Sequence, residues 1–336
     1  MSTPSIGTGS NWNPDPGTNN SLQSLTSLVG HVRGELAKVI VGQQELINLS
    51  LATIFCGGHA LIEGVPGVAK TLTVKCIARV LNVGFRRVQC NSDLMPADII
   101  GVNVFDAKTA DFNLHKGPIF TELLLVDEIN RMPPRTQAAL LEAMEERQAT
   151  IDGVSYPLPE SFTVFATQNP VEFEGTYPLP EAQLDRFLIK ITVDYPDLAS
   201  ELKILDEHNG GFDPRNVDSI EISSVGPESF AAARNAVAGI VVEPALMEYV
   251  AKIVRKSREW PAITLGASPR AAVAVLKVAK AFAAIEGREF IIPDDVKASA
   301  LCTLRHRIVL NPEAELEGTT SDQALEQVIR TVEVPK

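Results

Sequence analysis

The segment from Gly64 to Thr71 has the residue types and spacing to bind the phosphates of a nucleotide. It reads Gly-Val-Pro-Gly-Val-Ala-Lys-Thr, which matches the pattern G-x-x-x-x-G-K-[ST] except that Ala69 replaces the second glycine. Backbone N–H groups of such a loop turn toward an anion, and the following helix adds the positive end of its dipole. Lys70 could then reach the β- and γ-phosphates, and the Thr71 hydroxyl could bind Mg²⁺. The alternative is an ordinary Gly/Pro turn between a strand and a helix.

Two acidic residues could supply the metal ligand and the group that activates water. Asp127 and Glu128 end the apolar run 123–126, which is typical of a central parallel strand. The carboxyl ends of such strands line the ligand site in open α/β sheets. Asp127 would hold Mg²⁺, directly or through water, and Glu128 would polarise the attacking water. A solvated acidic turn is the alternative, and the independent signal of the phosphate loop weighs against it.

Asn169 is a further candidate, because it follows the apolar run 162–167. An Asn at that strand end could orient a water near the γ-phosphate. Taken alone, the residues before Pro170 are more typical of a turn.

These residues need strands and helices in a particular order to bring them together. Apolar runs predict five strands, at 60–62, 85–90, 122–126, 162–167 and 188–193. Helical spacing of apolar residues predicts helices at 22–36, 46–54, 72–81 and 134–147. Residues 94–120 form an irregular insertion with a possible hairpin from 101–105 to 111–115, and 150–154 reads as a hairpin with an Asp-Gly turn. We therefore predict a flexible tail at 1–20, an α/β nucleotide-binding core at 21–195 and a mostly helical domain at 196–336.

Composition narrows the classes of function. The 336 residues carry a net charge of −12 with a pI of about 5.0, which disfavours non-specific binding to nucleic acid or anionic membranes. No apolar run approaches the roughly 20 residues that a membrane helix needs, and no signal peptide is apparent. The four cysteines show no paired spacing, which favours buried thiols in a reducing compartment. We expect a cytoplasmic protein without membrane insertion.

With these motifs in place, the sequence resembles the MoxR family of AAA+ ATPases. The resemblance covers nearly the whole chain after the tail. The phosphate loop contributes to it, because the family also has alanine before the lysine. The other segments that carry it are 126–131 with the following Pro-Pro and Gln-Ala-Ala-Leu-Leu-Glu-Ala-Met-Glu-Glu, 166–170, 174–187 and 266–270.

The resemblance implies a fold and a set of roles. The fold is an AAA+ module with a five-stranded parallel sheet of order 5-1-4-3-2, a helix 2 insert at 94–120, a hairpin at 149–161 before sensor 1, and a small all-helical lid. Asn169 would be sensor 1 and Arg270 would be sensor 2. Arg186 would be the arginine finger, which contacts the γ-phosphate bound in a neighbouring subunit. ATP and Mg²⁺ are the implied ligands. The implied nucleotide-binding residues are Val41, Gly42, Gly64, Val65, Pro66, Gly67, Val68, Ala69, Lys70, Thr71 and Leu72.

The resemblance also implies a biological role. Family members assemble as hexameric rings, act as chaperones or maturation factors, and often partner proteins with von Willebrand factor A domains.

Several alternatives stay open at this stage. Arg186 could pair with Asp185 or a nearby acid, and the rival fingers are Arg131, Arg135 and Arg147. Whether Arg270 acts in its own subunit or in a neighbour is undecided. A nucleic-acid motor is disfavoured because the 94–120 insert has Asp98, Asp106 and Asp111 against Lys108 and Lys116, and so is not basic. The run 174–187 argues against a metal-chelatase subunit. The full set of acids and Asn169 argues against a scaffold that binds ATP without turnover.

Overall fold

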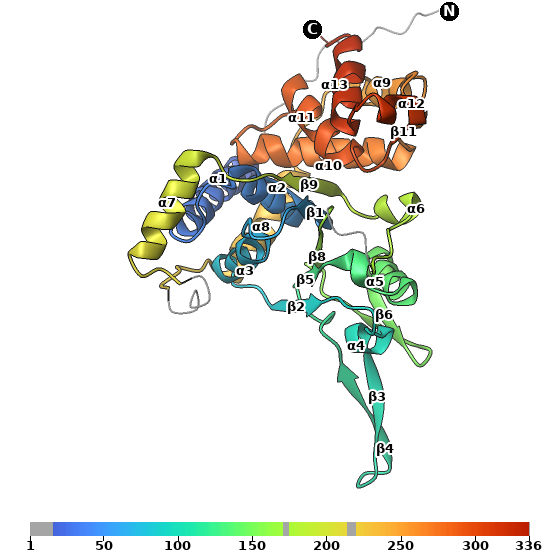
Figure 1. Ribbon diagram of the computed structural model, residues 1–336. Helices are drawn as coiled ribbons and strands as arrows, with labels where there is room; N and C mark the ends of the chain where they lie inside the picture. Colours follow the sequence, from blue (N-terminus) through green and yellow to red (C-terminus); the bar gives the residue numbers. More distant parts are fainter. Residues whose placement is uncertain (1–15, 171–174, 214–219, 336) are drawn as a thin grey trace, which may run out of the picture.

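Five parallel strands form the central sheet of the molecule (Figure 1). The computed structural model describes residues 16–170, 175–213 and 220–335. The sheet order is β2-β5-β8-β1-β9, and the strands are β1 (Ala60–Gly64), β2 (Phe85–Gln89), β5 (Leu123–Asp127), β8 (Thr163–Gln168) and β9 (Ile189–Val193). Numbered along the chain, these strands confirm the predicted order 5-1-4-3-2.

Alternating side chains of the strands fill two hydrophobic layers, one on each face of the sheet. Leu123 and Leu125 of β5 join the layer that contains α1 (Pro16–Leu36), α2 (Gln44–Phe55) and α3 (Lys70–Val80). Their neighbours Leu124 and Val126 join the opposite layer, under α5 (Pro134–Glu146). A strand buried on both faces must be apolar at every position, which explains the unbroken Leu-Leu-Leu-Val run.

Both predicted hairpins are present. The 94–120 insertion folds as α4 (Pro96–Ile100), β3 (Gly101–Asp106) and β4 (Asp111–Lys116), and the hairpin projects from the sheet (Figure 1). The second hairpin pairs β6 (Gln148–Ile151) with β7 (Val154–Pro157). Asp152 and Gly153 have φ values of 49° and 81°, as a two-residue turn with two left-handed positions requires. Short helices η1 (Ile129–Arg131) and α6 (Glu181–Leu184) complete this half of the chain.

The remaining chain is helical, apart from two short strands that the sequence analysis did not predict. Strands β10 (Ile263–Leu265) and β11 (Val309–Leu310) pair antiparallel, so the lid is not all-helical. Each is too short to show an alternating pattern. The helices are α7 (Leu198–Asn209), α8 (Pro227–Ala238), α9 (Pro244–Ser257), α10 (Pro269–Ile285), α11 (Pro293–Leu304), α12 (Pro312–Leu316) and α13 (Ser321–Thr331).

The lid helices rest on the core through specific contacts. Arg307 donates hydrogen bonds to the Asp185 carboxylate at 2.7 Å and to the Phe187 carbonyl at 2.6 Å, at the start of β9. Arg305 donates to the Thr192 hydroxyl at 2.7 Å. Helix α8 lies beyond residue 195 yet packs against α1, and its buried face belongs to the core layer. The division at 195 stays a prediction.

The ends of the predicted regions can be compared in part. Helix α1 begins at Pro16, inside the predicted tail 1–20, whereas residues 1–15 lie outside the described residues. Among the described residues, every helix is too short or too polar to cross a membrane.

Candidate functional site

The phosphate loop leaves β1 and enters α3 at Lys70, which is the strand–loop–helix order that the sequence predicted. Gly67 has φ 86° and a Cβ there would have no heavy atom within 4 Å, so the loop leaves open space above its backbone. Ala69 has φ 60°, which is the left-handed conformation that costs alanine more than glycine.

Lys70 stands at the mouth of this loop. Its Nζ donates hydrogen bonds to the carbonyl oxygens of Gly64 and Val65, the second at 3.0 Å. Burial lowers the pKa of Lys70, while the carboxylates of Asp127 and Glu128 oppose that shift. The ammonium group is therefore held beside the loop by backbone and balanced by acids across the pocket.

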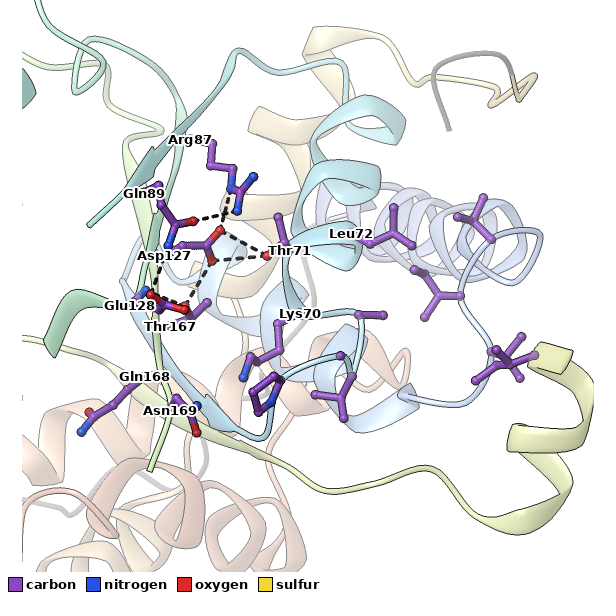
Figure 2. A pocket seen from close by; sticks show the side chains of 18 of the residues that line it. Lys70, Thr71, Leu72, Arg87, Gln89, Asp127, Glu128, Thr167, Gln168 and Asn169 are labelled. Carbon is purple, nitrogen blue, oxygen red and sulfur yellow. Dashed lines mark hydrogen bonds and ion pairs between the residues drawn. The ribbon is translucent and has the colours of Figure 1, made fainter. Parts of the chain in front are cut away.

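Asp127 is buried, and its carboxylate has three side-chain partners (Figure 2). Its carboxylate accepts hydrogen bonds from Thr71 Oγ1 at 3.3 Å and from Thr167 Oγ1 at 3.1 Å. Arg87 Nε lies 2.6 Å from its Oδ2. A carboxylate and a hydroxyl from two different elements thus converge, which is the donor set that Mg²⁺ takes alongside phosphate and water oxygens.

Glu128 follows at the end of the same strand, where the chain turns. Its φ of 60° is left-handed, and its N–H donates to Thr167 Oγ1 at 2.9 Å. Gln89 Nε2 donates to Glu128 Oε2 at 3.2 Å, and Arg131 Nε lies 3.4 Å from the same oxygen. The turn therefore points Glu128 into the pocket, where Gln89 and Arg131 hold its carboxylate.

These groups line one cavity of about 610 Å³. Val41 and every predicted loop residue from Pro66 to Leu72 line it, as do Asp127, Glu128 and Asn169. Apolar side chains of Val39, Ile40, Ile204 and Phe212 make its other end. A cavity with an apolar end, a loop of open backbone and a hydroxyl–carboxylate pair fits a nucleotide with Mg²⁺.

Three of the predicted nucleotide-binding residues lie near the cavity but do not line it. Gly64 and Val65 contribute the carbonyls that hold Lys70. Gly42 has φ 69° and lies against the Ser200 side chain of α7. In the described parts of the chain, these three shape the loop and its surroundings and do not line the cavity.

Sequence reasoning missed several residues of the cavity. Arg87, Gln89 and Thr167 end β2 and β8, and α7 with the loop after it adds Ile204, Glu207, His208 and Phe212. A polar residue at the carboxyl end of each parallel strand was a usable signal for the first three. Nothing in the sequence marked α7 as a wall of the cavity.

The two predicted arginines meet at one acid, away from this cavity. Arg186 Nε lies 3.1 Å from Glu145 Oε2, and Arg270 Nη1 lies 3.1 Å from Glu145 Oε1. Across residues 16–170, 175–213 and 220–335, none of these three lines the cavity. Asp185, the partner considered for Arg186, instead pairs with Arg307.

The rival arginines have other positions. Arg131 pairs with Glu128 of its own chain without lining the cavity. Arg147 donates to the carbonyls of Gly57 at 2.7 Å and Glu160 at 3.0 Å. Arg135 is exposed at the first turn of α5.

The arginines and the cavity lie at opposite ends of the parallel strands. We call the side where the strands begin the amino edge of the sheet, and the side where they end the carboxyl edge. Arg186 comes just before β9, and Glu145 ends α5 before β6 and β8. The cavity is at the carboxyl ends of β1, β5 and β8. In Figure 1 this difference appears as α5 and α6 on the right and α7, which walls the cavity, on the left.

Comparisons with known proteins agree with this geometry. Residues 59–189 match the model of the ATPase family associated with various cellular activities, and residues 255–328 match that of the AAA lid domain. The chain is 40% identical to chaperone MoxR1 of Mycobacterium tuberculosis, over 90% of this chain and 81% of that protein. This chain belongs to the MoxR family of AAA+ ATPases.

Further relatives of this MoxR-family chain cover almost its full length. It is 41% identical to the uncharacterized protein YeaC of Bacillus subtilis, over 93% of this chain and 97% of that one. A crystal structure from Cytophaga hutchinsonii, of a protein assigned provisionally as an ATPase, is 40% identical with a TM-score of 0.86. It matches over 95% of this chain and 98% of that one.

Proposed function

We propose that this chain hydrolyses ATP within a homo-oligomeric ring and uses the cycle to remodel or mature protein complexes. The observation that carries the proposal is the convergence of Lys70, Thr71, Asp127, Glu128 and Asn169 on one cavity. They come from three different elements, and their chemistry together covers phosphate binding, metal binding and water activation.

Each of these five residues has a distinct task in the proposed reaction. The N–H groups of the loop and the start of α3 bind the phosphates, and Lys70 exchanges its carbonyl partners for their oxygens. Thr71 and Asp127 would hold Mg²⁺, which when bound neutralises charge on the phosphate oxygens. Glu128 takes a proton from the attacking water, and Asn169 orients that water.

The arginines complete the site from a second subunit. Phosphoryl transfer gains most from cations placed against the developing charge on the γ-phosphate. Arg186 and Arg270 lie at the amino edge of the sheet, whereas the cavity lies at the carboxyl edge. A head-to-tail ring joins these two edges, which supports a role for both arginines in the neighbouring site. We infer six subunits from the family resemblance.

The proposed client is a protein complex, and the proposed partner contains a von Willebrand factor A domain. These two assignments rest on the family. The relative MoxR1 is named a chaperone, which agrees with a protein client. The experiment for this part is affinity capture of the Glu128→Gln form with ATP, followed by mass spectrometry. Recovery of nucleic acid in place of such a partner would contradict the proposal.

The Glu128→Gln substitution also tests the chemistry. We expect assembly with ATP to persist and hydrolysis to fall by roughly 10²-fold or more, because general base catalysis contributes about that much. Phosphate release and sedimentation velocity measure the two effects separately. Glu146→Gln, an exposed acid of α5, serves as the matched control and should hydrolyse normally. Undiminished turnover in Glu128→Gln would remove this residue from the mechanism.

A further inference from the structure

Helix α7 presents a row of leucines to solvent. Leu198, Leu202 and Leu205 recur at helical spacing and are 73%, 58% and 64% exposed. We call these three residues the leucine stripe. On the described part of the chain, α7 has no buried residue. A helix normally turns such a stripe toward a partner.

The stripe does not serve the helix's own cavity. Ile204, Glu207 and His208 line the cavity. By the helical repeat, Ile204 and Glu207 lie on the far side of α7 from the stripe, and His208 lies on its flank. Glu201 and Asp206 flank the stripe on either side, so its border is acidic. The surface that covers it should therefore be an apolar groove with cations at its margin.

The molecule carries a groove of that kind at the other edge of the sheet. It has a volume of about 730 Å³ and lies between the end of α2, α8 and the middle of α10. Its apolar lining includes Phe55, Val237, Val273 and Leu276. Among the described residues, its charged lining is Arg234, Lys277 and Lys280 with the acid Glu160. We call it the cationic groove.

Among the cationic side chains of this groove, Arg234 is partly buried and lies near another positive charge. Burial and the nearby Arg147 guanidinium both lower the pKa of Arg234. Lys280 Nζ donates to the Ala238 carbonyl at 3.1 Å, so it is held over the groove by the end of α8. An incoming carboxylate would relieve the repulsion between Arg234 and Arg147.

The stripe and the groove lie at opposite edges of the sheet. Helix α7 follows β9 at the carboxyl edge, whereas the end of α2 precedes β1 at the amino edge (Figure 1). Surfaces that are complementary but lie on opposite sides of one chain generate a head-to-tail assembly. Arg270 does not line the groove but begins the face of α10 that does, because Arg270, Val273, Lys277 and Lys280 recur on one face of that helix.

We propose that α7 of one subunit docks its leucine stripe into the cationic groove of the next subunit of the ring. The leucines fill the apolar floor, and Glu201 and Asp206 meet the cations at its margin. This is recognition of an amphipathic helix by a groove. Because Arg270 begins the same face of α10, docking brings the arginines to the neighbouring cavity. The inference rests on the ring of the proposed function and names the contact that builds it.

Cross-linking between two single-cysteine variants tests the contact. Leu202→Cys and Val273→Cys are made separately in chains that also carry Cys56→Ala and Glu128→Gln, because Cys56 lines the groove. Cys76, Cys90 and Cys302 are buried and stay in place. The two preparations are mixed with ATP and a short bismaleimide. We expect a cross-linked dimer in the mixture and none in either preparation alone.

The control replaces Leu202→Cys with Leu316→Cys, since Leu316 is a leucine of α12 that is 89% exposed. Sedimentation velocity on the same samples reports assembly independently. Rings that form without a cross-link above this control overturn the docking and leave the ring intact. A chain that stays monomeric with ATP overturns both.

A second pair of variants measures how much the contact contributes. Leu202→Asp should weaken ATP-dependent assembly by about tenfold or more, since a buried interface anchor contributes that much. Leu316→Asp should leave assembly unchanged. Both chains should keep their thermal stability, because both side chains are exposed in the single chain. Equal assembly by the two variants would overturn the proposal.

Discussion

The two edges of the central sheet are built in different ways. At the carboxyl edge, Asp127 is 5% exposed and is held by Thr71, Thr167 and Arg87. At the amino edge, the side chains of Glu145 and Arg270 are 36% and 54% exposed, and two ion pairs hold the cluster. Exposed ion pairs of this kind contribute little to stability, typically about 0–1 kcal/mol each.

This difference divides the proposed site into two halves. We call the acids at the carboxyl edge the fixed half, and the arginines at the amino edge the exchangeable half. The acids at the carboxyl edge keep their geometry through burial and several hydrogen bonds. The arginines at the amino edge are attached to one partly exposed acid, which a phosphate can replace at low cost. Under the proposed function, a preorganised cavity would bind the nucleotide, and the neighbouring subunit would supply the cations.

The largest expected effect comes from removing the proposed finger. Arg186→Ala should lower ATP turnover by roughly 10³-fold, the lower end of what such fingers contribute. Nucleotide binding should persist, since Arg186 lies away from its own cavity. Steady-state phosphate release and titration with a fluorescent ATP analogue measure these two quantities.

Mixing experiments decide which subunit the arginine serves. Lys70→Ala chains lack the loop lysine but keep Arg186, so mixing them with Arg186→Ala chains should restore part of the activity. Arg135→Ala, at an exposed arginine of α5, should remain active and is the control. If mixed rings form and no ratio restores turnover, the two edges do not share a site.

The sequence predicted the fixed half of the site well and the exchangeable half poorly. Residues 64–71 and 123–128 are local patterns that are continuous in sequence. The strand, the loop and the place of the two acids at the strand end were therefore predicted correctly. Residue 145 and residues 186 and 270 are far apart along the chain, and only packing of α5, α6 and α10 brings them together. Likewise, the prediction of a mostly helical region at 196–336 did not show that α7 would form there or which of its faces would be exposed. The two-residue strand β11 was too short to leave any pattern.

Removing the shared acid should have a smaller effect than removing the finger. Glu145→Gln keeps the size of the side chain but loses the charge that aligns Arg186 and Arg270. We expect turnover to fall by about 10- to 100-fold, because misplacing a catalytic group by about 1 Å costs up to that much. The KM for ATP should stay within about twofold, since the cavity is untouched.

A positioning role can be separated from a structural one with matched variants. Glu142→Gln removes an exposed acid from the same helix and should have full activity. Glu145→Asp keeps the charge and should recover much of the lost turnover. If Glu145→Gln raised turnover instead, the acid would be an inhibitor that withholds the arginines.

The smallest expected effect concerns the backbone of the fixed half. Ala69 has φ 60°, where alanine pays roughly 1–2 kcal/mol that glycine does not. Glycine in turn gains unfolded-state entropy that costs up to about 1 kcal/mol. Ala69→Gly should therefore raise the free energy of unfolding by about 0.5 kcal/mol and leave turnover within about twofold, as denaturant titration and phosphate release would measure. Ala138→Gly, at an exposed position of α5, should instead lower the free energy of unfolding by about 1 kcal/mol. If both substitutions lowered the free energy of unfolding equally, the loop would not be strained at Ala69. The preorganisation of the loop would then come from Lys70 and its carbonyl partners.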